Sequence, residues 1–171
     1  MKRLILVLAL AAVALTGVFA KSVKTDGLAL GVEWGGNYGF VNGLGAFGNN
    51  AAITFKLPSL PPMFGVSMAV GGSALGVGLT ADWWSYRAAL ATGSIDVFMY
   101  VGPGIYANLV LGSSFNLDAG LRIPVGFQFY VLQPLELFIE PALAIGVGGI
   151  GNSLRIPTVG IQLQVGARFW F

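Results

Sequence analysis

The charged residues of the predicted strands could do chemistry because they all fall on the same face of those strands. Glu33, Arg122 and Glu140 combine carboxylates with a guanidinium, a set that suits a catalytic cluster or the gate of a pore. The same set also suits a salt-bridge plug that fills a narrow interior. A buried charge without a partner is costly, so we expect these side chains to pair. The full set on this face is Glu33, Lys56, Asp82, Asp96, Asp118, Arg122, Glu136, Glu140 and Arg168.

Catalytic chemistry has little support in the composition. The chain has no histidine, which excludes a Ser-His-acid arrangement and any His-ligated metal, and it has no cysteine. Ser67 and Lys56 could face each other as a Ser-Lys pair, although such residues also suit a polar interior. The glycine runs at 102–105 and 146–149 lack the lysine and following helix of a phosphate loop. We therefore predict no enzyme, no metal and no cofactor.

Short alternating segments must position these charges. Large apolar residues alternate with small or polar ones, which is the period of a strand with two unlike faces. Eight such strands are predicted, at residues 28–34, 51–57, 64–70, 75–84, 95–102, 117–130, 135–146 and 161–171. Residues 35–49 and 146–153 are glycine-rich and are expected to be loops, and 85–93 a connection. Pro124 and Pro141 fall inside predicted strands, where each removes a ladder hydrogen bond.

The polarity of the two faces indicates where the strands lie. Hydrophobic residues make up 56% of the chain and charged residues only 9%, far below the usual quarter of a soluble protein. The face opposite the aliphatic residues is crowded with glycine and alanine, which suits the inside of a narrow barrel. A lipocalin-like barrel would have the opposite polarity. We therefore predict an all-β, eight-stranded, antiparallel, up-and-down transmembrane barrel with its apolar face toward lipid and a plugged interior.

The first residues predict export. Lys2 and Arg3 precede an apolar run, and the small residues before position 21 suit cleavage after Ala20, so residues 1–20 are expected to be a signal peptide and 21–171 the barrel. Removing the leader takes two of the nine basic residues and leaves seven bases against seven acids. No argument for nucleic-acid binding remains.

The last predicted strand ends on aromatic residues, as expected of an aromatic girdle at a membrane interface. It resembles the C-terminal assembly signal of bacterial outer-membrane proteins, which would comprise Leu163, Val165, Phe169 and Phe171. Three further segments, YVGPGIY at 100–106, LRIPVGF at 121–127 and LELFIEP at 135–141, together with the Asp82-Trp83-Trp84 strand, resemble the small OmpX/OmpA-like barrels, most of all a spirochaete-type group. The resemblance implies the outer membrane, surrounding lipid, and insertion by the barrel-assembly machinery. It implies no established catalytic residues.

Two functional classes stay open. The first is a monomeric structural or surface-interaction barrel whose loops meet lipid, a host or a partner protein, with Tyr38, Phe40 and Phe47 as loop contacts. The second is a narrow channel or lateral port for small hydrophobic molecules. Its lining would be the inward aromatics Trp84, Phe98, Tyr100 and Phe138.

Overall fold

All regular structure in the described part of the chain is β-strand. The computed structural model describes residues 27–44, 51–71, 74–113, 115–132, 134–151 and 153–171. In these ranges no helix has the length and hydropathy needed to cross a membrane. The strand segments are β1 (Ala29–Val41), β2 (Ala51–Lys56), β3 (Met63–Gly71), β4 (Ala74–Asp82), β5 (Tyr86–Ala91), β6 (Asp96–Val101), β7 (Gly104–Leu111), β8 (Asn116–Leu132), β9 (Leu135–Ile150) and β10 (Arg155–Trp170).

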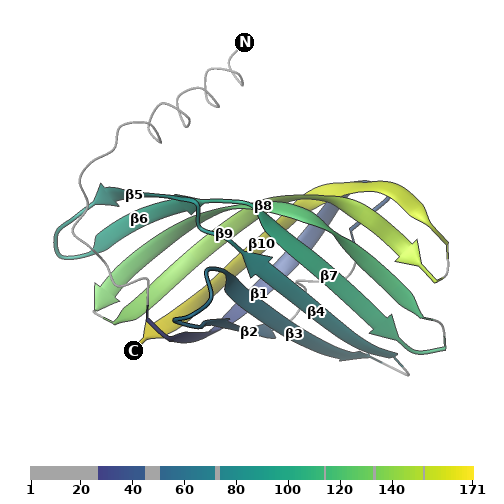
Figure 1. The fold of residues 1–171 in the computed structure, drawn as a ribbon, viewed down its shortest axis with the longest axis horizontal. Helices are drawn as coiled ribbons and strands as arrows, with labels where there is room; N and C mark the ends of the chain where they lie inside the picture. The colour runs from purple at the N-terminus through teal and green to yellow at the C-terminus, as the bar shows by residue number, and fades with distance from the viewer. Residues whose placement is uncertain (1–26, 45–50, 72–73, 114, 133, 152) are drawn as a thin grey trace, which may run out of the picture.

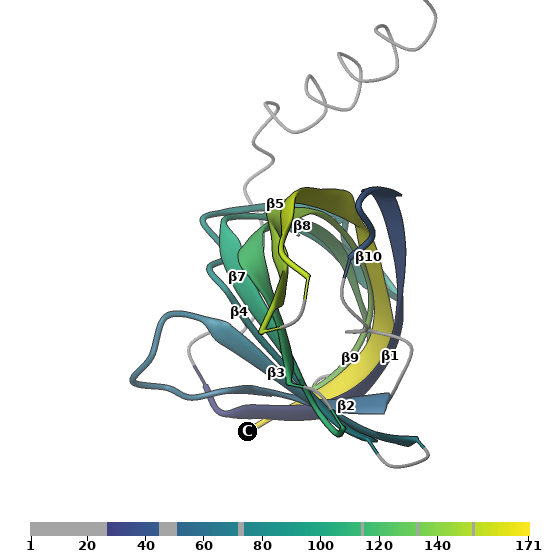
Figure 2. The same ribbon diagram turned by 90° about the vertical axis from the view of Figure 1, so that its right-hand side faces the viewer.

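The segments form one closed antiparallel barrel with eight strand positions (Figures 1 and 2). Around the ring the order is β1, β2, β3, β4, β7, β8, β9 and β10, and β10 pairs with β1 to close it. The remaining two segments, β5 and β6, form a hairpin that continues β4 and β7 past a break, and β6 pairs with the later half of β8. The predicted all-β, eight-stranded antiparallel barrel is confirmed.

The strands of the barrel are strongly tilted. Following paired residues once around the ring from Leu30 leads back to Val41, eleven positions farther along β1. With the usual strand spacings, this offset corresponds to a tilt of about 43° and a backbone radius of about 8–9 Å. An interior of that size is filled by side chains unless the side chains are small.

Strands β1, β9 and β10 extend well beyond the ranges predicted from the sequence, and β5 and β7 occupy residues that lie outside every predicted strand. Strand β1 continues through the glycines at 35–41, which pair with β10, and a strand of six residues occupies part of the expected connection at 85–93. Strand β9 likewise runs to Ile150 and β10 begins at Arg155, so the predicted loop at 146–153 is mostly strand. Glycine is a poor strand former in isolation, but here the neighbouring strand supplies the ladder.

Pro124 and Pro141 each pair with one neighbouring strand and lack a pair on the other side. Pro124 faces the break between β6 and β7, because its neighbours pair with Val101 and Gly104 on either side of that break. The β8–β9 register skips Pro141, passing from the Pro124–Ala142 pair to the Phe127–Ile139 pair. The strands therefore tolerate a residue without a backbone N–H at these two levels.

The two faces of the barrel have opposite character. Large aliphatic side chains lie exposed on the outside, for example Val32 (65% exposed), Met68 (64%) and Leu121 (62%) on three different strands. Every charged side chain in the described strands is buried or half-buried. The largest fully buried side chains include Arg122, Arg168, Tyr100, Gln128, Gln162, Glu136 and Glu140. The interior is thus polar and the outer surface apolar.

Candidate functional site

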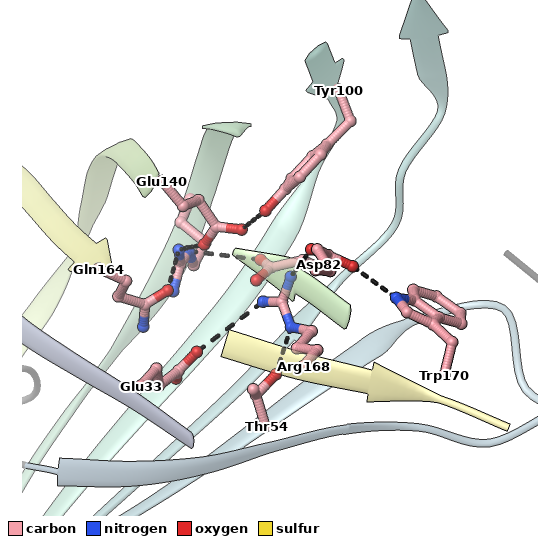
Figure 3. A network of polar contacts seen from close by, with 10 residues as sticks. Glu33, Thr54, Asp82, Tyr100, Glu140, Gln164, Arg168 and Trp170 are labelled. Carbon is pink, nitrogen blue, oxygen red and sulfur yellow. Dashed lines mark hydrogen bonds and ion pairs between the residues drawn. The ribbon is translucent and has the colours of Figure 1, made fainter. Parts of the chain in front are cut away.

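The first buried group of charges is centred on Arg122 of β8 and is called the Arg122 cluster. Its guanidinium Nε lies 3.3 Å from Asp82 Oδ1, and its NH2 group lies 2.5 Å from Glu140 Oε1 and donates to Gln164 Oε1 at 3.1 Å. The Tyr100 hydroxyl donates to the second oxygen of Glu140 (Figure 3). One side chain thereby joins β4, β9 and β10 across the middle of the barrel.

The second group, the Arg168 cluster, is centred on Arg168 of β10. Its NH1 group donates to Glu136 Oε1 at 2.8 Å, and its NH2 group lies 3.9 Å from Glu33 Oε2. Its Nε donates to the Thr54 hydroxyl at 3.1 Å (Figure 3). Its guanidinium lies 3.5 Å from the centre of the Phe138 ring. This residue therefore joins β1, β2 and β9.

Polar contacts continue from the Arg168 cluster to the end of the barrel where β1 begins, here called the lower end. Glu136 accepts hydrogen bonds from Trp170 Nε1 at 2.6 Å and from the Tyr130 hydroxyl at 3.3 Å. Arg87 of β5 donates twice to Gln128 Oε1, at 3.1 and 2.9 Å, and its guanidinium lies 5.2 Å from the centre of the Phe98 ring. Sequence reasoning missed Arg87, because the alanine-rich segment around it was expected to be a connection.

Inward-facing glycines make room for these large side chains. Tyr100 lies directly opposite Gly126, where an added Cβ would come within 1.9 Å of the ring carbon Cζ. Phe138 lies opposite Gly166 in the same way, with a Cβ at 2.7 Å from the ring. Gly104 lies beside Arg122, and a Cβ there would come within 2.9 Å of its Cγ. The alternation of glycine with bulky residues is therefore what fits the clusters into a narrow interior.

The other predicted interior charges lie apart from these clusters. Lys56 is buried at the lower end of β2, and its ammonium donates to the Leu57 carbonyl at 3.1 Å and to the Leu60 carbonyl. Asp96 lies in the β5–β6 hairpin, where it is half-buried and accepts a hydrogen bond from Gly93 N at 3.1 Å. This hydrogen bond lies within the turn of the hairpin and does not involve either cluster.

No catalytic arrangement is assembled from the candidates. Glu33 belongs to the Arg168 cluster and Glu140 to the Arg122 cluster, so both carboxylates are engaged by a guanidinium. Ser67 lies opposite Ala52, four residues along β2 from Lys56, a separation of about 13 Å along the strand. The two therefore do not form a Ser-Lys pair. Within the described ranges no group of three or more acids could hold a metal ion.

A smaller polar group lies at the opposite, upper end of the barrel, where β10 begins. Arg155 NH2 lies 3.2 Å from Asp118 Oδ1, which also accepts from Gly149 N at 2.7 Å. Arg155 NH1 donates to the Asn42 carbonyl at 2.7 Å, and Asn42 Nδ2 donates to the Pro157 carbonyl at 2.8 Å. These bonds connect β1, β8, β9 and β10 at the upper rim.

The remaining predicted residues that the structure describes lie on the outer surface. Tyr38 and Phe40 are exposed and in edge-to-face contact, with ring centres 5.4 Å apart, but they belong to β1 and not to a loop. Phe47 and the predicted leader at 1–20 lie outside the described residues. The C-terminal residues Leu163, Val165, Phe169 and Phe171 are exposed on the outside of the closing strand and just beyond it.

Comparisons of this chain with protein-family models, with curated proteins and with solved structures found no match.

Proposed function

We propose that this protein is an integral outer-membrane barrel of the OmpX/OmpA-like kind, monomeric and non-catalytic, with a closed interior and a structural or surface-interaction role. In this proposal residues 1–20 are removed on export, and the barrel-assembly machinery inserts the chain by reading the outward residues of β10. The observation that carries the proposal is the polarity of the barrel, with charges buried inside and aliphatic side chains exposed outside.

That polarity is difficult to reconcile with a water-exposed surface. Soluble monomers rarely expose continuous apolar patches larger than a few hundred Å². Here the outward residues of every strand position contribute to the apolar belt, while the described strands place no charge on it. A hydrocarbon environment accounts for both facts, because it favours the aliphatic residues and penalises an outward charge.

The two arginine clusters support a closed interior. Arg122 bridges to β4, β9 and β10, and Arg168 bridges to β1, β2 and β9, so together they cross the interior in several directions. The inward aromatics that would line a hydrophobic conduit are packed instead. Trp84 stacks on Tyr100 at 4.3 Å between ring centres, and Arg168 covers Phe138. These contacts favour the plug over the channel or lateral port.

Electrophoresis and planar-bilayer recording test this proposal together. The full chain is expressed for export, and the purified protein is run on gels with and without heating and then added to bilayers. We expect a heat-dependent mobility shift and no discrete channel openings. Discrete openings would contradict the plug. Recovery of the protein in the soluble fraction, without the mobility shift, would contradict the membrane barrel.

A further inference from the structure

The two arginine clusters contain more acidic than basic side chains. Their carboxylates are those of Glu33, Asp82, Glu136 and Glu140, and their guanidinium groups are those of Arg122 and Arg168. All four acids are at most 5% exposed. With every group ionised, four negative charges would face two positive ones inside the barrel. A buried charge without compensation is very costly, so the excess must be neutralised.

The other basic side chains of the described strands are held elsewhere. Arg87 donates to the Gln128 amide oxygen, and the Lys56 ammonium donates to two backbone carbonyls. Arg155 pairs with Asp118 at the upper rim. Within the described ranges the acids are not grouped in a way that could hold a metal ion. A proton bound to a carboxylate is the remaining way to neutralise the interior.

Glu33 is the acid of the two clusters that an arginine holds least closely. The shortest contacts of Asp82, Glu136 and Glu140 with their arginines are 3.3, 2.8 and 2.5 Å. For Glu33 the shortest is 3.9 Å, from its Oε2 to Arg168 NH2 (Figure 3). Its other oxygen, Oε1, is buried and has no hydrogen-bond partner among the described residues. Oε1 is therefore the oxygen where a proton would relieve the largest deficit.

A hydroxyl group lies where it could accept a hydrogen bond from that proton. Gly65 of β3 leaves a space between β1 and β4, and a Cβ added there would lie 2.9 Å from Glu33 Oε1 and 2.5 Å from Thr80 Oγ1. The two oxygens thus approach the same point over this glycine. Thr80 is 6% exposed, and a hydroxyl oxygen can accept from a carboxylic acid. A protonated Glu33 therefore has an acceptor that an ionised Glu33 could not use in this way.

The charges that reach Glu33 from the other strands do not favour its ionised form. Glu140 of β9 and Asp82 of β4 repel it, whereas Arg168 of β10 and Arg122 of β8 attract it. Each arginine is closer to another carboxylate than to Glu33. Next to Glu33, β2 and β3 contribute only alanine, threonine, glycine and serine to the inner face. We propose that Glu33 carries a proton at neutral pH, and that loss of this proton in alkaline solution loosens the barrel. This pH switch requires only the closed barrel and does not depend on the membrane proposal.

Infrared spectroscopy of the full protein in detergent micelles tests for the proton directly. The C=O stretching band of a carboxylic acid is separate from the bands of a carboxylate. We expect this band in the unmodified protein at neutral pH, and Glu33→Gln should lower its intensity. Glu136→Gln is the matched control, because it removes the carboxylate closest to Arg168 and should leave the band of Glu33 in place.

The free energy of unfolding of the same proteins is the second measurement. An unfolded chain releases the proton of a free glutamate at about pH 4.3, so a folded barrel that keeps this proton becomes less stable as the pH rises above that value. Glu33→Gln resembles the protonated acid, so it should be at least as stable as the unmodified protein at neutral pH and should lose part of this decline. Glu136→Gln should be less stable, because Arg168 loses its closest partner.

Three results would overturn the proposal. The first is the absence of a carboxylic acid band from the unmodified protein at neutral pH. The second is a band that Glu33→Gln leaves unchanged, since another acid would then hold the proton. The third is a Glu33→Gln variant that is destabilised or fails to fold at neutral pH, because Glu33 would then act as an ionised partner of Arg168.

Discussion

Replacing Arg122 by methionine tests whether the Arg122 cluster stabilises the barrel or is a dispensable group of charges. The substitution keeps the apolar stem of the side chain and removes the guanidinium from Asp82, Glu140 and Gln164. The two carboxylates are 4% and 1% exposed, so neither can recover its hydration by a small movement. Breaking a buried ion pair by removing one partner costs about 3–5 kcal/mol. That is a large part of the total stability of about 5–15 kcal/mol expected for a folded domain.

The matched control removes the carboxylate charges as well. In the triple variant Arg122→Met, Asp82→Asn, Glu140→Gln, no charged side chain remains in the Arg122 cluster. We expect it to regain more than half of the stability lost by the single variant, because well-packed neutral groups often replace a buried ion pair at little cost. Urea titration in lipid vesicles, followed by tryptophan fluorescence and gel mobility, gives the free energy of unfolding of each variant.

Two results would refute this reasoning. A loss below about 1 kcal/mol in the single variant would mean that the two carboxylates are not dependent on Arg122. A triple variant no more stable than the single one would mean that the loss came from packing and not from charge. Bilayer recording of the single variant adds an independent readout, because a loosened plug should admit ions while the unmodified protein does not.

Three further substitutions have definite expectations. Gly126→Val should destabilise the barrel by about 1–3 kcal/mol or more, since its Cβ would lie 1.9 Å from the Tyr100 ring. Gly76→Ala should change the stability by less than about 0.5 kcal/mol. Equal urea midpoints for the two variants would contradict the packing argument. Leu121→Arg should cost about 2–4 kcal/mol in vesicles if this outward residue faces lipid, and a cost near zero would place it in water. Arg155→Ala should cost less than about 1 kcal/mol of stability, because the Arg155 side chain is 34% exposed. The same change should speed hydrogen exchange at the Gly149 amide, which donates to Asp118. An unchanged exchange rate would mean that Asp118 holds this amide without help from Arg155.

The parity of the strands made much of the interior predictable from sequence. Side chains of a strand alternate between two faces, so placing the aliphatic residues outside placed Glu33, Arg122 and Glu140 inside together. The same reasoning placed Trp170 and Gln164 inside, without indicating what they would contact. A period of two fixes the face of a residue but not its height relative to residues of distant strands.

The pairing of charges depends on the offset with which the barrel closes. Glu33 shares its sequence environment with no arginine, and the eleven-position offset around the ring brings it to Arg168 on β10. No local pattern encodes that offset. Strand β5 escaped prediction for a related reason, because alanine has low strand propensity and the segment is held by its pairing with β6.

The pairing of β1 with β10 also has a consequence for the order of folding. Ala29 pairs with Trp170, 141 positions later in the chain, so the β1–β10 ladder joins the most distant strands and we expect it to form last. Until it forms, Glu33 and Thr54 lack the guanidinium of Arg168, and β1 presents an unpaired edge. Closing so long a loop has a large entropic cost before any contact offsets it, so we expect ring closure to be the slow step of folding. The contacts of the Arg168 cluster are therefore expected to form late in folding, and weakening them should raise the unfolding rate far more than it lowers the folding rate.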